Sequence, residues 1–291
     1  MNNRYSPHAQ PMEQREQKPN LFGLCRVAKE EYDSQPMASL TMAAIGGSIE
    51  SWSGMRIWHH KTMHKKFKYR FSGLIILKVA LLFYQQIYSM NIVTDKIQHT
   101  DAVIIGENNE KVFLFVHGQG GNKEETIHFA KIAVPLGYQV IGIDLSIMDM
   151  PWNVLPKLLG VKAYLKIHYS SISLRANSIG CWYSMLAFEN DEIDKALFVS
   201  PILDMKRFIE GMEERDELYY EWVVSHQIAT WPNETFILRP EKDLVVNDNV
   251  NEAFINRFLC NVVTLKNGEH WFHTPEQMLS LRKWEESVLN K

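Results

Sequence analysis

The stretch "LRANSIGCWYSML" (residues 174–186) decides the fold, because its character changes at one serine. The residues before Ser178 continue a β-branched run, whereas apolar residues recur at roughly helical spacing after it. Ser178 is set between two small residues, Ala176 and Gly180. A strand that turns sharply into a helix at a serine is the layout of a nucleophile elbow. Since small-x-Ser-x-Gly also occurs in ordinary turns, the rest of the chain has to supply a base, an acid and an oxyanion site.

Short apolar runs alternate with amphipathic stretches from Asp101 to the end of the chain. The runs span residues 102–106, 112–116, 139–145, 171–174, 196–200, 235–239 and 261–265. Such runs, nearly continuous and β-branched, indicate strands buried on both faces of a parallel sheet. The helices expected between and after them cover residues 123–137, 152–169, 180–190, 250–259 and 274–289. This alternation predicts an α/β fold with right-handed crossovers, although the first two runs could instead form a hairpin across "ENNEK".

The N-terminal part differs in composition from the rest of the chain. Residues 1–36 are polar, contain no secretory signal and are predicted to be a disordered tail. Residues 37–95 are predicted to be a helical segment that is both basic and apolar. Residues 51–94 include seven Lys and Arg but no Asp or Glu, a composition that suits a membrane surface better than DNA. The longest apolar run there has about fourteen residues, short of the ~20 that a secure membrane span needs. The segment could therefore span a membrane, lie on one, or pack as a core helix.

Charge and cysteine content limit the partners and cofactors. The net charge of the 291-residue chain is only −3, so we expect no nucleic-acid partner. Cys25, Cys181 and Cys260 are far apart and form no CxxC pair, which fits a reducing, cytoplasmic compartment. Cys181 is expected to be a buried helix residue rather than a nucleophile. His60 and His64 lie one helical turn apart without an evident third ligand, so we expect no metal and no cofactor.

A glycine-rich loop, "HGQGG" (residues 117–121), follows the second apolar run. Glycines there let the backbone present an N–H group to a developing oxyanion. The loop lacks the Lys-Ser/Thr pair of a P-loop and the spacing of a dinucleotide fingerprint. An oxyanion site is therefore favoured over a phosphate site.

Two further polar residues follow the later runs. Asp243 lies in an "EKD" turn after residues 235–239, and His270 lies in a "GEH" loop after residues 261–265. Each alone would be an ordinary solvated residue. Together with Ser178 they give the order Ser, Asp, His, which is that of one hydrolase architecture and not that of chymotrypsin or subtilisin. Asp204, after residues 196–200, is the rival candidate for the acid.

With its HGQGG, ANSIG, EKD and GEH motifs, the stretch of residues 101–291 resembles a compact bacterial α/β-hydrolase. The resemblance implies a mostly parallel sheet of about seven strands with helices on both faces. It implies a serine hydrolase that cleaves an ester or a related acyl bond of a small molecule. The alternatives are an acyltransferase with the same residues, or a non-catalytic, membrane-associated protein with a degenerate hydrolase domain. Residues 207–232 lie where relatives carry a cap; its Tyr and Trp residues would either cover an apolar pocket or pack on the sheet.

The same resemblance assigns a role to each site residue. Ser178 is the expected nucleophile, His270 the general base and later the general acid, and Asp243 the residue that orients the imidazole. The backbone N–H groups of Gln119 and Ile179 are the expected oxyanion hole. One departure is Ala176, which stands where the family has the first glycine of the elbow. Another is the "SIMDMPWN" loop (residues 146–153), which replaces a loop that commonly contains Gly or His.

A second resemblance concerns residues 44–79. Their GGS, GM and H-K-T-x-H-x-x-F motifs are similar to the C-terminal half of a short, uncharacterised family of bacterial membrane proteins. The upstream membrane segments of that family are not found in this sequence. The resemblance implies a fused or truncated membrane-protein fragment attached to the hydrolase-like part.

Overall fold

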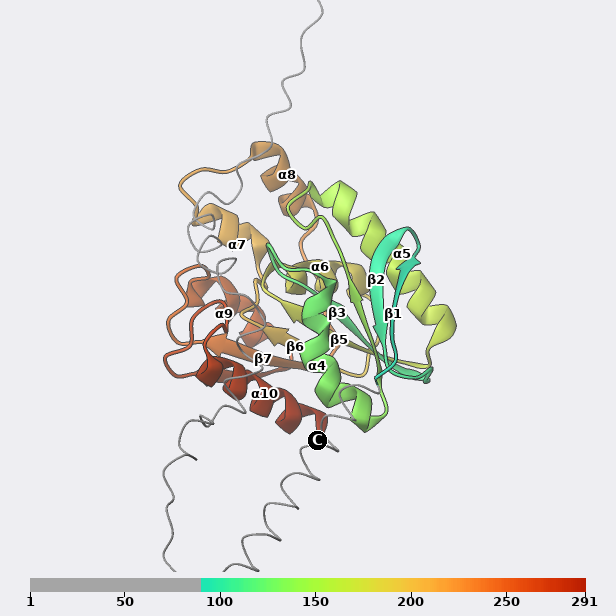
Figure 1. The fold of residues 1–291 in the computed structure, drawn as a ribbon. Coiled ribbons are helices and arrows are strands. Elements are labelled where there is room, and N and C mark those ends of the chain that lie inside the picture. The colour runs from blue at the N-terminus through green and yellow to red at the C-terminus, as the bar shows by residue number, and fades with distance from the viewer. Residues whose placement is uncertain (1–89) are drawn as a thin grey trace, which may run out of the picture.

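The computed structural model describes residues 90–291, which form one eight-stranded sheet with helices on both sides (Figure 1). The predictions for residues 1–36 and for most of 37–95 lie outside the described residues. The strand order is β1-β2-β4-β3-β5-β6-β7-β8, with β2 antiparallel to both of its neighbours and every other pair parallel. The strands are β1 (Ile92–Ile97), β2 (Thr100–Ile105), β3 (Lys111–Val116), β4 (Gln139–Ile143), β5 (Ser171–Asn177), β6 (Ala196–Val199), β7 (Thr235–Pro240) and β8 (Cys260–Leu265).

The sheet has one strand more than the seven expected. All seven predicted runs are strands, and β1 is the additional one. It pairs with β2 in a hairpin whose two turn residues, Gln98 and His99, have φ of 49° and 67°. Two consecutive residues at positive φ are the geometry of a type I′ turn. The hairpin therefore joins β1 to β2, and the alternative hairpin across "ENNEK" is wrong because β4 lies between β2 and β3.

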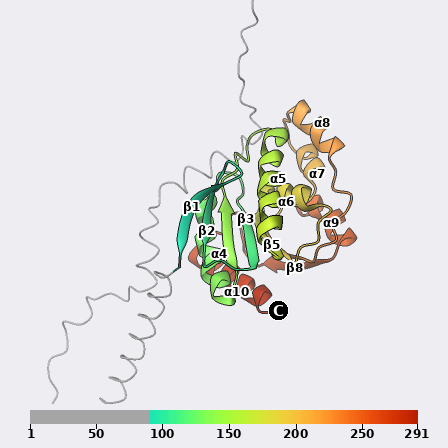
Figure 2. The same cartoon turned by 90° about the vertical axis from the view of Figure 1, so that its right-hand side faces the viewer.

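Helices cover the two faces of the sheet in separate layers (Figure 2). One layer contains α4 (Thr126–Ala133) and α10 (Pro275–Leu289), which contact each other. The other contains α5 (Pro151–His168) and α6 (Ile179–Phe188). The shorter helices α7 (Met205–Glu210), α8 (Glu217–Ser225) and α9 (Asp248–Arg257) pack in the same layer. Within residues 90–291, no helix is both long and apolar enough to cross a bilayer.

Two hydrophobic cores lie on opposite faces of the sheet, and β3 supplies side chains to both. Along β3, Val112, Leu114 and Val116 belong to the core under α5 and α6, while Phe113 and Phe115 belong to the core under α4 and α10. This alternation follows from the two-residue period of a strand. Because both faces are covered, the run has to be apolar throughout, as the sequence shows.

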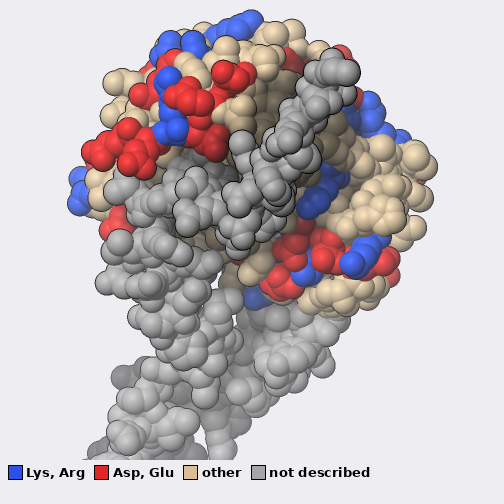
Figure 3. Space-filling model, turned by 90° about the horizontal axis from the view of Figure 1, so that it is seen from above, with Lys and Arg blue, Asp and Glu red and all other residues tan. Residues whose placement is uncertain are grey.

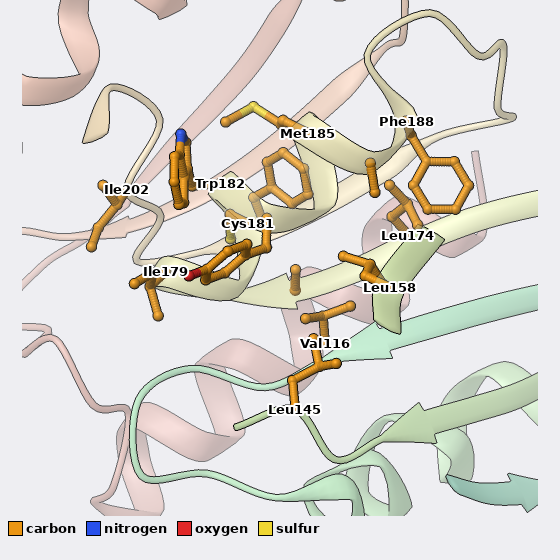
Figure 4. Packing of buried hydrophobic residues seen from close by; sticks show 14 of the residues in the cluster. Val116, Leu145, Leu158, Leu174, Ile179, Cys181, Trp182, Met185, Phe188 and Ile202 are labelled. Carbon is orange, nitrogen blue, oxygen red and sulfur yellow. The ribbon is translucent and has the colours of Figure 1, made fainter. Parts of the chain in front are cut away.

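Helix α6 is the most deeply buried helix of its layer. Figure 4 shows its side chains packed against residues of β3, β5, α5 and the loops after β4 and β6. The labelled residues are Ile179, Cys181, Trp182, Met185 and Phe188 of the helix, with Val116, Leu145, Leu158, Leu174 and Ile202 around it. A helix that is apolar all round has no solvent-exposed face, so packing contacts on every side fix its position. The turn at its N-terminus is therefore placed rigidly at the carboxyl end of β5.

Candidate active site

Ser178 occupies a strained turn between β5 and α6. Its φ of 49° and ψ of −122° lie outside the regions that a side-chain-bearing residue normally adopts. The turn is held from β6 and the loop after it, because the Ser178 N–H donates to the Val199 carbonyl at 3.0 Å and the Ile202 N–H donates to the Ser178 carbonyl at 3.2 Å. Such strain occurs where the surrounding structure over-determines a conformation, and it is common at functional sites.

Small residues around Ser178 allow the backbone segments to touch. A Cβ atom on Gly180 would lie 2.4 Å from the carbonyl oxygen of His117, and one on Gly118 would lie 3.2 Å from the Ser178 Cβ. Gly180 is therefore required by close approach. Ala176, the departure from the family pattern, is fully buried in β5, and its methyl group is accommodated in the core.

His270 links Ser178 to Asp243. Its Nε2 lies 3.0 Å from the Ser178 Oγ, and its Nδ1 lies 2.8 Å from the Asp243 Oδ2. The carboxylate can only accept, so Nδ1 carries the proton and Nε2 is left to accept from the serine hydroxyl. The His270 carbonyl accepts from the Ser200 hydroxyl at 2.8 Å, which fixes the loop that carries the imidazole. The structure thus brings the three predicted residues together in one hydrogen-bonded chain.

Asp243 and its rival Asp204 have different partners. The second carboxylate oxygen of Asp243 accepts from the N–H groups of Val245 and Val246, both at 2.8 Å, and its side chain is 8% exposed. Asp204 instead caps α7, where it accepts from the Arg207 N–H at 3.0 Å and pairs with the Arg207 guanidinium. Only Asp243 contacts His270.

The two predicted oxyanion donors lie on adjoining segments. Ile179 opens α6, so its N–H is among those that have no acceptor within the helix. Gln119 belongs to the loop after β3, and the side chain of His117 fixes this loop by two hydrogen bonds. The His117 Nε2 accepts from the Leu145 N–H at 3.1 Å, so its Nδ1 carries a proton and donates to the Gly118 carbonyl at 2.7 Å. His117 thereby ties this loop to the segment that follows β4.

Cys181 does not compete with Ser178 for the role of nucleophile. Its side chain points into the core beneath α6 (Figure 4). Burial raises the pKa of its thiol, so the sulfur stays protonated. Among residues 90–291, no three His, Cys, Asp or Glu side chains are grouped in a way that could hold a metal ion.

The segment expected to act as a cap packs on the fold. Tyr219 and Val223 of α8 are buried, and the Tyr219 hydroxyl lies 3.3 Å from that of Tyr183 on α6. Trp222 stacks on His226 with ring centroids 3.8 Å apart. On this face of the molecule, acidic and basic side chains are intermixed rather than gathered into one patch of a single sign (Figure 3).

A pair of charged residues beside the oxyanion loop, Lys123 and Asp144, was not predicted from the sequence. A pocket of about 360 Å³ lies beside that loop, and Asp144 at the end of β4 forms part of its wall. Asp144 accepts from the Lys123 backbone N–H at 2.7 Å and from the Lys123 ammonium at 2.5 Å; this side-chain hydrogen bond raises the pKa of Lys123. Asp144 could not be selected by its position after a strand, because it lies inside the predicted run of residues 139–145, whereas β4 ends at Ile143.

Comparison with known proteins supports the fold. No protein-family model matches the chain, and no curated protein matches its sequence. Solved structures do match: Est1E from Butyrivibrio proteoclasticus has a TM-score of 0.56 at 16% identity, covering 68% of this chain and 98% of that one. An α/β serine hydrolase homologue from Coxiella burnetii has a TM-score of 0.50 at 17% identity, covering 68% and 97%. XC6422 from Xanthomonas campestris, described as an α/β serine hydrolase without lid, has 0.50 at 13% identity, covering 69% and 94%. From the strand order and these similarities, the described part of this chain has the α/β-hydrolase fold.

Proposed function

We propose that the protein is a serine hydrolase that cleaves an ester or a related acyl bond of a small molecule through an acyl-enzyme. The hydrogen-bonded chain from Ser178 through His270 to Asp243 is the observation that carries this proposal. A serine hydroxyl is a weak nucleophile unless a base adjoins it, and a base adjoins it here. The similarity to Est1E and to serine hydrolases adds support at the level of the fold.

The first half-reaction acylates Ser178. As the Oγ attacks the carbonyl carbon of the substrate, the His270 Nε2 takes the hydroxyl proton, and Asp243 stabilises the resulting imidazolium. The tetrahedral oxyanion accepts hydrogen bonds from the backbone N–H groups of Gln119 and Ile179. When the intermediate collapses, the alcohol leaves with the proton from His270.

The second half-reaction releases the acid. Water gives a proton to the His270 Nε2 and attacks the acyl carbon, and the collapse of the second tetrahedral intermediate returns the proton to the Ser178 Oγ. The buried positions of His270 and Asp243, with side chains 4% and 8% exposed, keep bulk water from competing for the bond between them. One site therefore serves both steps, with His270 alternating between base and acid.

Replacement of Ser178 or His270 tests the proposal. We expect the wild type to turn over short p-nitrophenyl esters, and Ser178→Ala or His270→Ala to lower kcat by about 10⁴-fold or more. A fluorophosphonate probe should label the wild type and not Ser178→Ala. Ser225→Ala, at the exposed end of α8, is the matched control and should keep full activity. Unchanged turnover in a folded Ser178→Ala variant would remove Ser178 from the reaction.

A further inference from the structure

The N–H groups assigned to the oxyanion hole belong to segments that follow two different strands. Gln119 lies in the loop after β3, and Ile179 lies in the elbow after β5. An oxyanion hole works when its donors are about 2.7–3.1 Å from the position of the developing oxyanion. The separation of the two segments therefore matters as much as the shape of each.

Asn177 and Glu125 connect these two segments. The amide Nδ2 of Asn177, the residue before Ser178, donates to the Glu125 Oε2 at 3.4 Å. The other oxygen of the same carboxylate packs against the oxyanion loop, because a Cβ atom on Gly121 would lie only 2.5 Å from the Glu125 Oε1. One carboxylate thus contacts the elbow through one oxygen and the loop through the other.

Arg175 holds Asn177 in place from within β5. Its Nη1 donates to the Asn177 Oδ1 at 2.6 Å, and its Nε donates to the Glu285 Oε1 of α10 at 2.8 Å. The guanidinium carbon lies 5.5 Å from the centroid of the Phe115 ring and 6.0 Å from that of Phe129, so aromatic faces confine it as well. Arg175 and Glu285 are 2% and 4% exposed.

A buried ion pair such as Arg175–Glu285 contributes little net stability to the fold. Desolvation of two charges offsets their attraction, and a well-packed apolar pair is often as stable or more so. Burial is the largest influence on the Glu285 carboxyl and raises its pKa, against the opposing effect of the Arg175 charge. The pair does, however, fix the direction of a guanidinium three residues before Ser178.

We propose that Arg175, Asn177 and Glu125 are positioning residues that set the spacing between the oxyanion loop and the nucleophile elbow. The network rests on the proposed role of Ser178 and extends it to residues that do not touch the substrate. It acts on the transition state, since only the oxyanion depends on both segments at once. Ground-state binding of the substrate depends on it much less.

The first test compares variants of Glu125. Glu125→Ala should lower kcat about tenfold with KM little changed, since complete loss of one oxyanion donor costs about 10²–10³-fold. Its affinity for a boronic acid, which forms a tetrahedral adduct with the serine, should fall by the same factor. Glu125→Gln should restore both values, because the amide oxygen still accepts from Asn177. Glu124→Ala is the matched control, since that neighbouring side chain is 53% exposed and pairs with Lys123.

The second test separates positioning from stability. In the double variant Arg175→Met/Glu285→Leu the buried charges are gone, so the melting temperature should stay near that of the wild type. Its kcat should nevertheless fall about tenfold, as in Glu125→Ala, because Asn177 loses its donor. A folded double variant with wild-type kcat and boronate affinity would overturn the proposal, as would a fully active Glu125→Ala.

Fluorophosphonate labelling distinguishes a failure of the proposed function from a failure of the positioning role alone. If the wild type is not labelled at Ser178, the proposed function itself is wrong. If the wild type is labelled and the Glu125 and Arg175/Glu285 variants match it in kcat, only the positioning role is wrong.

Discussion

Ser178, His270 and Asp243 could be selected from the sequence because each lies within a few residues of the end of a strand and the three occur in a characteristic order. The same rule could not exclude Asp204, since that residue also follows a strand. What separates the two acids is local: Asp204 precedes a short helix and accepts from its Arg207 N–H, as an N-cap residue does. No helix was predicted to begin at Met205, so the capping role of Asp204 was not among the predictions from the sequence.

Replacing each acid by its amide should distinguish their roles. Asp243→Asn is expected to lower kcat by about 10⁴-fold, because the amide no longer holds His270 in the tautomer that accepts from serine. Asp204→Asn should leave kcat and stability nearly unchanged, because Asn is as good an N-cap as Asp. Steady-state ester kinetics on both purified variants make the comparison. If Asp204→Asn is the more impaired enzyme, the assignment of the acid is wrong.

The glycine of the elbow should tolerate no side chain. In Gly180→Ala the added methyl group would lie 2.4 Å from one backbone oxygen, that of His117, and 2.8 Å from another, that of Val116. Neither oxygen can move without breaking the contact between β3 and α6. We expect the variant to melt at a lower temperature and to lose fluorophosphonate labelling. Gly211→Ala is the control, because φ there is −85° and the nearest atom to its Cβ, the Phe208 oxygen, would be 3.5 Å away.

At the scale of elements, the sequence located seven strands and missed the eighth. The residues of β1 are exposed except for Ile97, and a polar edge strand has no apolar run to reveal it. The end of β5 was also predicted too early, at residue 174 instead of Asn177. The apolar run stops before Arg175, a charged residue whose partner Glu285 lies on a helix 110 residues further along the chain. Pairing across that distance has no local signal.

The partly buried carboxyl of Glu125 should make stability depend on pH. Burial is the largest influence on it and raises its pKa above the usual 4.5. The folded state then binds a proton more tightly than the unfolded state, so this group favours folding as the pH falls towards 4.5 and opposes it as the pH rises. Urea unfolding of the wild type and of Glu125→Gln between pH 7 and 4.5 should show the wild type gaining stability relative to the variant on acidification.

Glu124→Gln is the control for loss of a charge at the surface in the same turn. A difference between wild type and Glu125→Gln that stays constant over the whole pH range would contradict the prediction.

At the scale of the whole molecule, the sequence predicted the layers and the edge at which the site lies. Parallel strands end at the same edge of a sheet, so the loops after β3, β5, β7 and β8 converge there. This convergence can be predicted without considering the side chains. What the sequence could not give is the spacing of those loops, which depends on Glu125, Arg175 and the rigid seating of α6. It also placed the start of the hydrolase-like part at residue 101, whereas the sheet begins at Ile92.

The last prediction concerns the role of the N-terminal part. Since β1 begins at Ile92 and the Gly106 N–H donates to the Asn91 carbonyl, a fragment of residues 90–291 should fold and turn over esters like the full chain. A fragment of residues 101–291 lacks β1 and the buried Ile97, so it should melt at a lower temperature. We further propose that residues 51–94 attach the protein to an anionic membrane surface, because each Lys or Arg near such a surface contributes roughly 1 kcal/mol.

Sedimentation with vesicles tests that attachment. The full chain should sediment with phosphatidylserine-containing vesicles at low salt and be released at high salt, since exposed charges are screened within about 10 Å at 0.1 M ionic strength. The 90–291 fragment should stay in the supernatant under both conditions, and vesicles of neutral lipid are the control. Equal sedimentation of the full chain and the fragment would show that the seven basic residues at positions 56–78, which the fragment lacks, do not carry the attachment. Loss of ester turnover in a folded 90–291 fragment would show instead that the N-terminal part completes the active site.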